Sequence, residues 1–294
     1  MHPLYLVDAP IYFFRSWFAF PDRFFSPEGH STNGLYGYAH FLLDLLIQKK
    51  PVYIAAAFDE SLNTCFRNRI FPEYKANREQ PDENLTYQLN QCRRLTSLLG
   101  VVNIAHKEYE ADDIIGSLKK QLGRRRSVII VTRDKDLGQL LGKKDKIWDP
   151  VQDEYQHKED IVRKFGVPPE SVADLLALAG DAVDNIPGVP GIGVKTASAI
   201  LNFAGSVNNL MRNPGIILNS EIKGAARVCE TLLDHRQAII KYKQLTTVFC
   251  DMNLGLDISS IKVRPASRRK LLFYCDEVNF GTAIRAKMKT LGVV

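Results

Sequence analysis

The sequence predicts an α/β fold in which a mostly parallel sheet with flanking helices is followed by a mainly helical part. Three short apolar runs, residues 4–8, 52–59 and 127–134, look like buried strands, and each runs into an aspartate. Segments with apolar residues at helical spacing lie between these runs. Strands that alternate with helices are typical of a parallel sheet with helices on both faces.

Helical periodicity predicts three helices inside this α/β part. The second of them has Asp82 as a start signal and Gly100 as a stop signal. A short apolar run before the third helix predicts one more strand. The expected helices cover residues 35–46, 85–99 and 111–122, and the added strand covers residues 101–104.

Helical periodicity dominates after about residue 150, so we place a domain boundary near Gly166. Residues 1–166 form the predicted α/β part and residues 167–294 the predicted helical part. The last helical stretch, residues 268–278, is expected to pack back on the first part. The other helical stretches, joined by Gly/Pro turns, are residues 157–165, 168–180, 193–203 and 225–240.

The composition is that of a globular protein. The chain has 294 residues, of which 45% are hydrophobic and 24% charged, and no apolar run approaches the ~20 residues that span a bilayer. The first residues carry no basic segment or cleavage site, so no signal peptide is expected. Five cysteines without a CxxC pair argue against a disulfide scaffold or a zinc site and predict a cytoplasmic location. The net charge of +6 is compatible with a nucleic-acid partner.

Acidic side chains follow each of the three main predicted strands. Ligands of an open α/β sheet bind at the carboxyl ends of its strands, so we expect Asp8, Asp59 and Asp134 to meet at one edge. Further acids open the third helix, follow the last of these strands, and stand three apart in a later turn. The nine candidate metal ligands are Asp8, Asp59, Glu110, Asp112, Asp113, Asp134, Asp136, Asp181 and Asp184.

Converging carboxylates of this number require cations. Two unit charges ~4 Å apart repel by about 4 kcal/mol at an effective dielectric near 20. Oxygen ligands without His or Cys suit Mg²⁺ or Mn²⁺ rather than zinc. Two such ions are a known device for in-line attack on a phosphodiester. The sequence therefore predicts a two-metal site for two Mg²⁺, with Mn²⁺ as a substitute.

Each acidic group also has an ordinary structural interpretation. The acids at 110, 112 and 113 could favour a helix N-terminus electrostatically. Asp134 and Asp136 could cap the short helical segment that follows. Asp181 and Asp184 could be turn formers. Each interpretation is reasonable alone, whereas all of them holding at once would be a large coincidence.

A glycine-rich turn at residues 188–196 predicts a helix-hairpin-helix. Glycines allow close approach of the backbone to a ligand, and the following helix N-terminus offers free N–H groups to a phosphate. The alternative is an ordinary turn between helices. The candidate DNA-contact residues here are Gly188, Val189, Gly191, Ile192, Gly193, Lys195 and Thr196.

Basic and aromatic residues alternate in residues 65–84, just after Asp59. This pattern suits single-stranded nucleic acid, in which phosphates meet charges and bases meet rings. Taken alone, a solvated basic loop is the better interpretation. Arg15, downstream of Asp8, could face the site or the solvent. The candidate contact residues are Arg15, Arg67, Lys75 and Arg78.

The sequence resembles the 5′-nuclease family of flap endonucleases and 5′→3′ exonucleases, which includes the nuclease domain of bacterial DNA polymerase I and stand-alone relatives. The resemblance covers nearly the whole chain. It departs at Ala9, where the family usually has glycine, and in the Phe-rich residues 20–31. The matching motifs are LVDA, TNGLYGY, FDE, FRNRIFPEYKANR, EYEADDIIGSL, TRDKDLGQLL, LAGDAVDNIPGVPGIGVKTA and LLFYCDEVNFGTAI.

The resemblance implies a PIN-like α/β core, a helical arch at about residues 62–100 and a helix-hairpin-helix at about 183–205. It implies that Lys75 and Arg78 contact the scissile phosphate, and that the hairpin backbone holds a monovalent cation such as K⁺. Asp112 and Asp113 would lie between two metal clusters. The first cluster would be Asp8, Asp59, Glu110 and Asp112, and the second Asp134, Asp136, Asp181 and Asp184.

The expected function is that of a metal-dependent 5′ nuclease acting on DNA with a 5′ flap, a nick or a free 5′ end, including RNA-primed ends. All the catalytic acids of the family pattern are present, which favours an active enzyme. We expect a nucleoid-associated monomer, with a polymerase as a conceivable partner. A non-catalytic binder of DNA junctions is the alternative. A haloacid-type phosphatase is disfavoured, because its DxD would follow the first strand, where this chain has Asp8 alone.

Overall fold

The computed structural model describes residues 2–21, 23–60, 64–78 and 82–294. A six-stranded sheet has the order β3-β2-β1-β4-β5-β6. The first five strands are parallel and β6 is antiparallel to β5. The strands are β1 (Leu4–Asp8), β2 (Tyr53–Asp59), β3 (Val102–His106), β4 (Val128–Val131), β5 (Lys146–Asp149) and β6 (Glu154–Gln156).

The expected α/β class is confirmed, and two strands are added to it. β5 and β6 were not predicted, because four- and three-residue strands give little alternation to detect. The predicted strand at 101–104 is β3. β4 ends at Val131, so Asp134 lies three residues beyond the strand and not in it.

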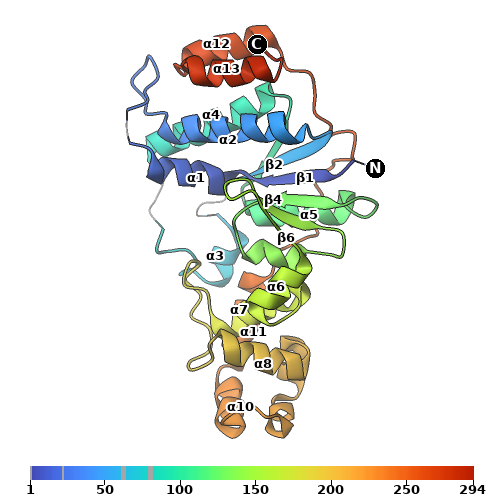
Figure 1. Ribbon diagram of the computed structural model, residues 1–294. Helices are drawn as coiled ribbons and strands as arrows, with labels where there is room; N and C mark the ends of the chain where they lie inside the picture. The colour runs from blue at the N-terminus through green and yellow to red at the C-terminus, as the bar shows by residue number, and fades with distance from the viewer. Residues whose placement is uncertain (1, 22, 61–63, 79–81) are drawn as a thin grey trace.

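Helices cover both faces of the sheet (Figure 1). Alternating residues of each strand face opposite sides, as the pleat requires. Leu4 and Leu6 of β1 belong to the hydrophobic cluster that contains α5, whereas Tyr5 and Val7 belong to the cluster with α1, α2 and α4. These helices are α1 (Ala9–Ala19), α2 (Asn33–Lys49), α4 (Glu83–Leu98) and α5 (Ala111–Leu122), and the short α3 (Phe66–Ile70) follows β2.

The helix start and stop signals act as the sequence indicates. The Asp82 side chain accepts a hydrogen bond from the Leu85 N–H at 2.6 Å and caps α4. Gly100 follows the end of α4 with a φ of +79°. Part of the predicted arch, residues 62, 63 and 79–81, lies outside the described residues.

The second part of the chain is helical and extends the core on the α5 side of the sheet. Cluster residues Leu175 of α7 and Ile200 of α8 share one hydrophobic cluster with Leu6 of β1. The prediction of one helical stretch at 225–240 needs correction, because the chain breaks at His235 into two helices. The elements are α6 (Lys158–Phe165), η2 (Pro169–Ser171), α7 (Val172–Ala179), α8 (Val194–Ala204), α9 (Val207–Arg212), η3 (Pro214–Asn219), α10 (Ala225–Asp234) and α11 (Arg236–Thr246).

The C-terminal helices return to the first part, at the opposite end of the molecule from α10 (Figure 1). α12 (Arg268–Glu277) contacts α4, and α13 (Thr282–Thr290) contacts α2. The Tyr274 hydroxyl donates a hydrogen bond to the Gln91 carbonyl at 2.9 Å. The segment before α12 crosses the amino ends of the strands, where Ile54 N–H bonds Ile261 O at 3.0 Å.

In the described ranges, no helix combines the length and the apolar character that crossing a bilayer would require.

Candidate active site

Five of the predicted acids line one cavity of about 1000 Å³ at the carboxyl edge of the sheet, where the parallel strands end. Asp8 ends β1 and Asp59 ends β2. The other three follow β3 and β4 in the chain, at the start of α5 and before the short helix η1 (Asp136–Leu140). The strand ends therefore bring these carboxylates together. The five are Asp8, Asp59, Glu110, Asp112 and Asp134.

Asp8 is a buried carboxylate at the centre of this group. Burial raises the pKa of Asp8 to about 7, and the neighbouring Asp134 and Asp59 raise it further against the Thr132 hydrogen bond. The Thr132 hydroxyl donates that bond to Asp8 Oδ2 at 2.7 Å. For Asp112, burial and then the charges of Asp134 and Asp8 likewise hold the pKa well above its ordinary value. These raised values indicate a site short of positive charge.

Asp136 and Asp181 continue the acidic group beyond the cavity wall. Burial, then the charges of Asp134 and Asp181, raise the pKa of Asp136 to about 8. Asp136 Oδ1 is buried without a hydrogen-bond partner in the described part of the chain. An orphaned carboxylate oxygen among other carboxylates fits a hard divalent cation.

Glu110 differs from the other acids because cations surround it. Burial alone would raise the pKa of Glu110, but the charges of Lys75 and Arg67 hold it at about 2. Lys75 Nζ lies 2.5 Å from Glu110 Oε1 and 3.6 Å from Asp184 Oδ2. The Tyr74 hydroxyl lies 3.0 Å from an oxygen of each of these carboxylates. Tyr74 and Lys75 therefore connect the two predicted clusters.

Arg78 also reaches the acids. Its Nη2 lies 3.0 Å from Asp184 Oδ1, and the Lys75 N–H donates to the Asp184 carbonyl at 3.1 Å. Lys75 has a φ of +55°, so the chain turns sharply at this point. Both predicted arch cations thus contact acids of the site in this structure.

The carboxylates gather, but they do not form a ready ligand set. In the described ranges, no three side chains of His, Cys, Asp or Glu are arranged to hold one metal ion. Lysine ammonium groups pair with several of these carboxylates instead. Lys75 bridges Glu110 and Asp184, and Lys135 Nζ lies 3.5 Å from Asp181 Oδ2. The donor set suits divalent cations, and binding them requires these side chains to move.

Asp113 and Arg67, predicted as a metal ligand and a DNA contact, form a buried ion pair with each other in this structure. Asp113 is fully buried and its two oxygens accept hydrogen bonds from Arg67 at 2.7 Å each. The Arg67 side chain is 3% exposed and also donates to the carbonyls of Leu245 and Thr247. This pair ties α3 and α5 to the end of α11.

The predicted hairpin divides into a packed half and an open half. Gly188 has a φ of +69°, and a Cβ on it would lie 2.3 Å from the Gly180 nitrogen. The predicted role of Gly188 in approaching a ligand is therefore replaced by close packing against the protein backbone. The side chains of Val189 and Ile192 are buried against the protein, so only the backbone of these two residues borders the surface. Gly191 has open space around its Cα.

The rest of the open half keeps the predicted surface. Gly193 is also unobstructed and is the N-cap of α8. Lys195 is exposed and Thr196 is half-buried in the first turn of that helix. The free N–H groups at this end of α8 can meet a phosphate.

Aromatic side chains that sequence reasoning missed line the cavity beside the exposed Arg15. Phe14 and Phe18 of α1 belong to this wall, and Phe18 is 79% exposed. The four-residue spacing of these two rings places them on one helix face, which was the available signal. Exposed rings beside carboxylates and cations suit unpaired bases.

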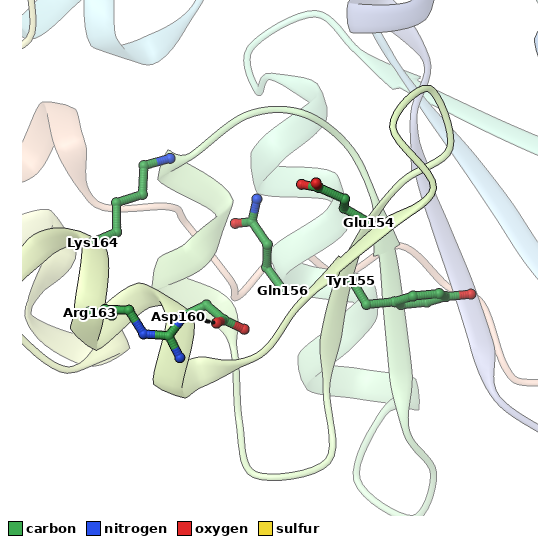
Figure 2. Close-up of a pocket in the computed structure, with 6 residues that line it drawn as sticks. All are labelled: Glu154, Tyr155, Gln156, Asp160, Arg163 and Lys164. Atoms are coloured by element: carbon green, nitrogen blue, oxygen red, sulfur yellow. Dashed lines mark ion pairs between the residues drawn. The ribbon is translucent and has the colours of Figure 1, made fainter.

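A second hollow, of about 510 Å³, lies between β6 and α6 and has a different character (Figure 2). The Tyr155 and Gln156 side chains leave the strand in opposite directions, and Arg163 pairs with Asp160 at 3.1 Å. Its charges are mixed and none of the nine candidate acids lines it.

Comparisons with known proteins agree with this geometry. Residues 3–166 match the family model "5'-3' exonuclease, N-terminal resolvase-like domain", and residues 167–269 match "5'-3' exonuclease, C-terminal SAM fold". A 5'-3' exonuclease of Aquifex aeolicus is 37% identical over 214 residues, which cover 72% of this chain and 73% of that protein.

Longer relatives match as well. DNA polymerase I of Rhizobium leguminosarum is 33% identical over 290 residues, covering 96% of this chain and 28% of that protein. The chain thus spans less than a third of the length of that polymerase.

Solved structures share the fold. A T5 5'-exonuclease with zinc bound has a TM-score of 0.67 at 19% identity, covering 99% of each chain. The catalytic core of Rad2 in complex with DNA substrate has a TM-score of 0.65 at 16% identity, covering 100% of this chain and 92% of that one. Together with the two matching family models, the 37% identity to the Aquifex enzyme shows that the chain belongs to the 5'-3' exonuclease family.

Proposed function

We propose that this 5'-3' exonuclease hydrolyses DNA phosphodiesters at the junction of single strand and duplex, using two divalent cations held by its acidic cavity. The observation that carries the proposal is the meeting of five carboxylates from four separate segments in one cavity, beside Lys75 and Arg78. Helix starts use the side chains of Asp59, Glu110 and Asp134 as acceptors, but capping does not account for Asp8 and Asp112 in the same cavity. The arrangement suits phosphoryl chemistry, in which positioning and charge stabilisation supply most of the catalysis.

The acids divide between two ions in our proposal. Two Mg²⁺, with Mn²⁺ as a substitute, would supply activation of a water and stabilisation of the departing 3′ oxygen. Asp112 stands between the two groups. The first ion would be held by Asp8, Asp59, Glu110 and Asp112, and the second by Asp134, Asp136, Asp181 and Asp184.

The cations of residues 74–78 act on the phosphate. Lys75 and Arg78 pair with Glu110 and Asp184 in the structure. Lys75 and Arg78 would turn from these acids to the scissile phosphate and would stabilise its developing charge, if bound cations took over the neutralisation of Glu110 and Asp184. Phe14 and Phe18 offer stacking surfaces to the bases next to it.

The duplex is held away from the cavity. Gly191, Gly193, Lys195 and Thr196 present backbone N–H groups, a charge and a hydroxyl at the start of α8. Such contacts are made to phosphates, so binding is independent of sequence and sensitive to salt. We also propose that a K⁺ ion joins the hairpin carbonyls to the DNA.

The substrates we propose are 5′ flaps, nicks and free 5′ ends, including RNA-primed ends. Cleavage would leave a 5′-phosphate and a 3′-hydroxyl for ligation. The role would be flap and primer removal in replication and repair, by a monomer in the cytoplasm at the nucleoid, with a polymerase as partner.

The test is cleavage of a labelled 5′-flap duplex with Mg²⁺ by the protein and by Asp134→Asn. The variant should lose cleavage by at least about a hundredfold while the Kd for the flap, measured in EDTA, stays within about threefold. This follows because the change removes a cavity carboxylate and no phosphate contact. An equally active variant would overturn the assignment of Asp134. Binding without any cutting by the unaltered protein, over a range of metal concentrations, would favour a junction binder instead.

A further inference from the structure

Basic side chains collect at the amino edge of the sheet, opposite the acidic cavity. We call this set the basic band. It draws on two loops and on the segment that crosses the strand ends. Its members are Arg124, Arg125, Arg126, Lys143, Lys144, Lys262 and Arg264.

The sheet register places these groups side by side. Residues 124–126 end two positions before β4 begins, residues 143–144 end two positions before β5 begins, and these strands are parallel neighbours. Lys262 bridges to Tyr53 at the start of β2, and the Arg264 N–H bonds the Gly100 carbonyl just before β3. The five parallel strands span about 19 Å at ~4.8 Å per strand. The basic band therefore runs across the whole parallel sheet.

The band is poorly neutralised. Arg124, Arg125, Lys143 and Lys144 are exposed, and in the described ranges none of them forms an ion pair. The nearby acids have other partners. Asp145 pairs with Lys119 and Asp251 with Lys120, and Asp257, which lines the same hollow as residues 124–126, accepts hydrogen bonds from the Ser259 and Ser260 hydroxyls. Positive charge without internal partners is available to an outside anion.

One loop of the basic band borders a hollow. Residues 124–126 line a hollow of about 720 Å³ together with residues 250–253. Arg126 is held over the Tyr53 ring at 4.6 Å, which orients one guanidinium at the rim.

We propose that the basic band is a second nucleic-acid site, which binds a phosphodiester backbone outside the path that leads to the acidic cavity. A strand the length of β1 separates the two edges by roughly 15 Å, and the α5–β4 loop lies on the side away from α1 and α3 (Figure 1). A row of exposed Lys and Arg about 19 Å long suits the regularly spaced phosphates of a nucleic-acid backbone. A short acidic peptide would need only the hollow and would leave the rest of the row unused.

The basic band would let one protein molecule hold a second DNA segment while a junction occupies the acidic cavity. That segment is either a separate DNA molecule or a distant part of the same long DNA. This inference goes beyond the proposed cleavage and does not depend on it. Its test therefore measures binding in EDTA and needs no turnover.

The experiment counts bound DNA by titration calorimetry with a short hairpin duplex that is too small to reach both edges. At low salt the protein should bind two equivalents, the weaker one disappearing steeply as salt rises. Arg124→Gln/Arg125→Gln should lose the second equivalent or weaken it at least about tenfold, with the first Kd unchanged. Lys143→Gln/Lys144→Gln, from the neighbouring loop, should weaken the same event.

The matched control is Arg163→Gln/Lys164→Gln on α6, an exposed adjacent basic pair outside the band (Figure 2). It should keep both equivalents. A single equivalent in the unaltered protein would overturn the proposal, as would loss of the second equivalent in the control, which would show that net charge and not place is decisive. If a labelled oligo-glutamate peptide binds and Arg124→Gln/Arg125→Gln abolishes that binding while no second DNA equivalent exists, the band is an acidic-peptide site and the proposal is wrong.

Discussion

At the residue scale, neighbouring acids of one helix start have opposite roles. Asp112 and Asp113 are adjacent in the chain, yet successive helix residues point about 100° apart. Asp112 lines the acidic cavity, whereas Asp113 turns inward to Arg67 and also accepts a bond from the Phe249 N–H at 2.8 Å. Of these two adjacent aspartates, one is thus a candidate metal ligand and the other belongs to a structural ion pair.

Asp113→Ala should therefore destabilise the protein strongly. The change leaves the Arg67 guanidinium buried without its carboxylate, and breaking a buried pair in this way costs about 3–5 kcal/mol. Urea unfolding followed by circular dichroism measures the loss. Glu108→Ala is the control, because it removes an exposed partner of Arg69 and should change stability by less than about 1 kcal/mol. Similar small losses in both variants would show that the buried pair does not hold these helices together.

Lys75 is expected to compete with divalent cations. Its Nζ is 2.5 Å from Glu110 Oε1, so an incoming ion must displace a charge that already satisfies this carboxylate. Lys75→Met should therefore bind Ca²⁺ at least about tenfold more tightly in the absence of DNA, equivalent to about 1.4 kcal/mol. Titration calorimetry with Ca²⁺ measures it, and Arg69→Met is the control that should leave the affinity unchanged. Unchanged or weaker Ca²⁺ binding by Lys75→Met would contradict the competition.

At the element scale, the turn between α7 and α8 positions two acids of the second group. Asp181 and Ile186 bond each other through both backbone groups at 2.8 Å, which closes a small loop around Asp184. This closure is possible because Gly180 and Gly188 pass each other without side chains. The two glycines thus help to position Asp181 and Asp184, because they allow the backbone that carries these acids to close into this loop.

Gly188→Ala should disrupt this turn, and Gly191→Ala should not. Both residues have φ near +70°, so each alanine bears a left-handed strain of roughly 1–2 kcal/mol. Only at Gly188 would the new Cβ also collide with backbone, whereas nothing lies within 4 Å of it at Gly191. Thermal unfolding should show the larger drop in Tm for Gly188→Ala. Equal drops in the two variants would mean that the close backbone contact is unimportant.

At the scale of the whole molecule, the sheet separates two hydrophobic clusters and both depend on the second half of the chain. The cluster on the α5 side continues through α7 and α8, and the cluster on the α2 side is closed by α12 and α13. The domain boundary predicted at Gly166 therefore falls inside continuous packing. The division of the chain into two domains at this residue stays a prediction, and the hydrophobic core is continuous across it.

A fragment of residues 1–166 should consequently fail to fold cooperatively. It would expose the apolar faces of the first part that the second part covers in the full chain, and a domain needs its own core for independent stability. Urea titration of the fragment should give no sigmoidal transition, whereas the full chain should give one. A cooperative transition in the fragment would show that the α/β part is stable alone.

The sequence by itself determined the strands that end in Asp8 and Asp59, the cap at Asp82 and the family motifs, because these depend on neighbours in the chain. It also identified the acids that now line the cavity. Periodicity and turn chemistry act over a few residues, and the parallel sheet then brings strand ends to one edge.

Only the tertiary structure decided that Arg67 and Asp113 are structural, that Gly188 packs on Gly180, and that Lys75 rests on Glu110. Arg67 bonds the Leu245 carbonyl across 178 positions of sequence, a contact that no local pattern announces. The direction in which a side chain points at a helix start depends on what packs against it. Burial and long-range pairing therefore set the roles of residues whose local sequence allows several.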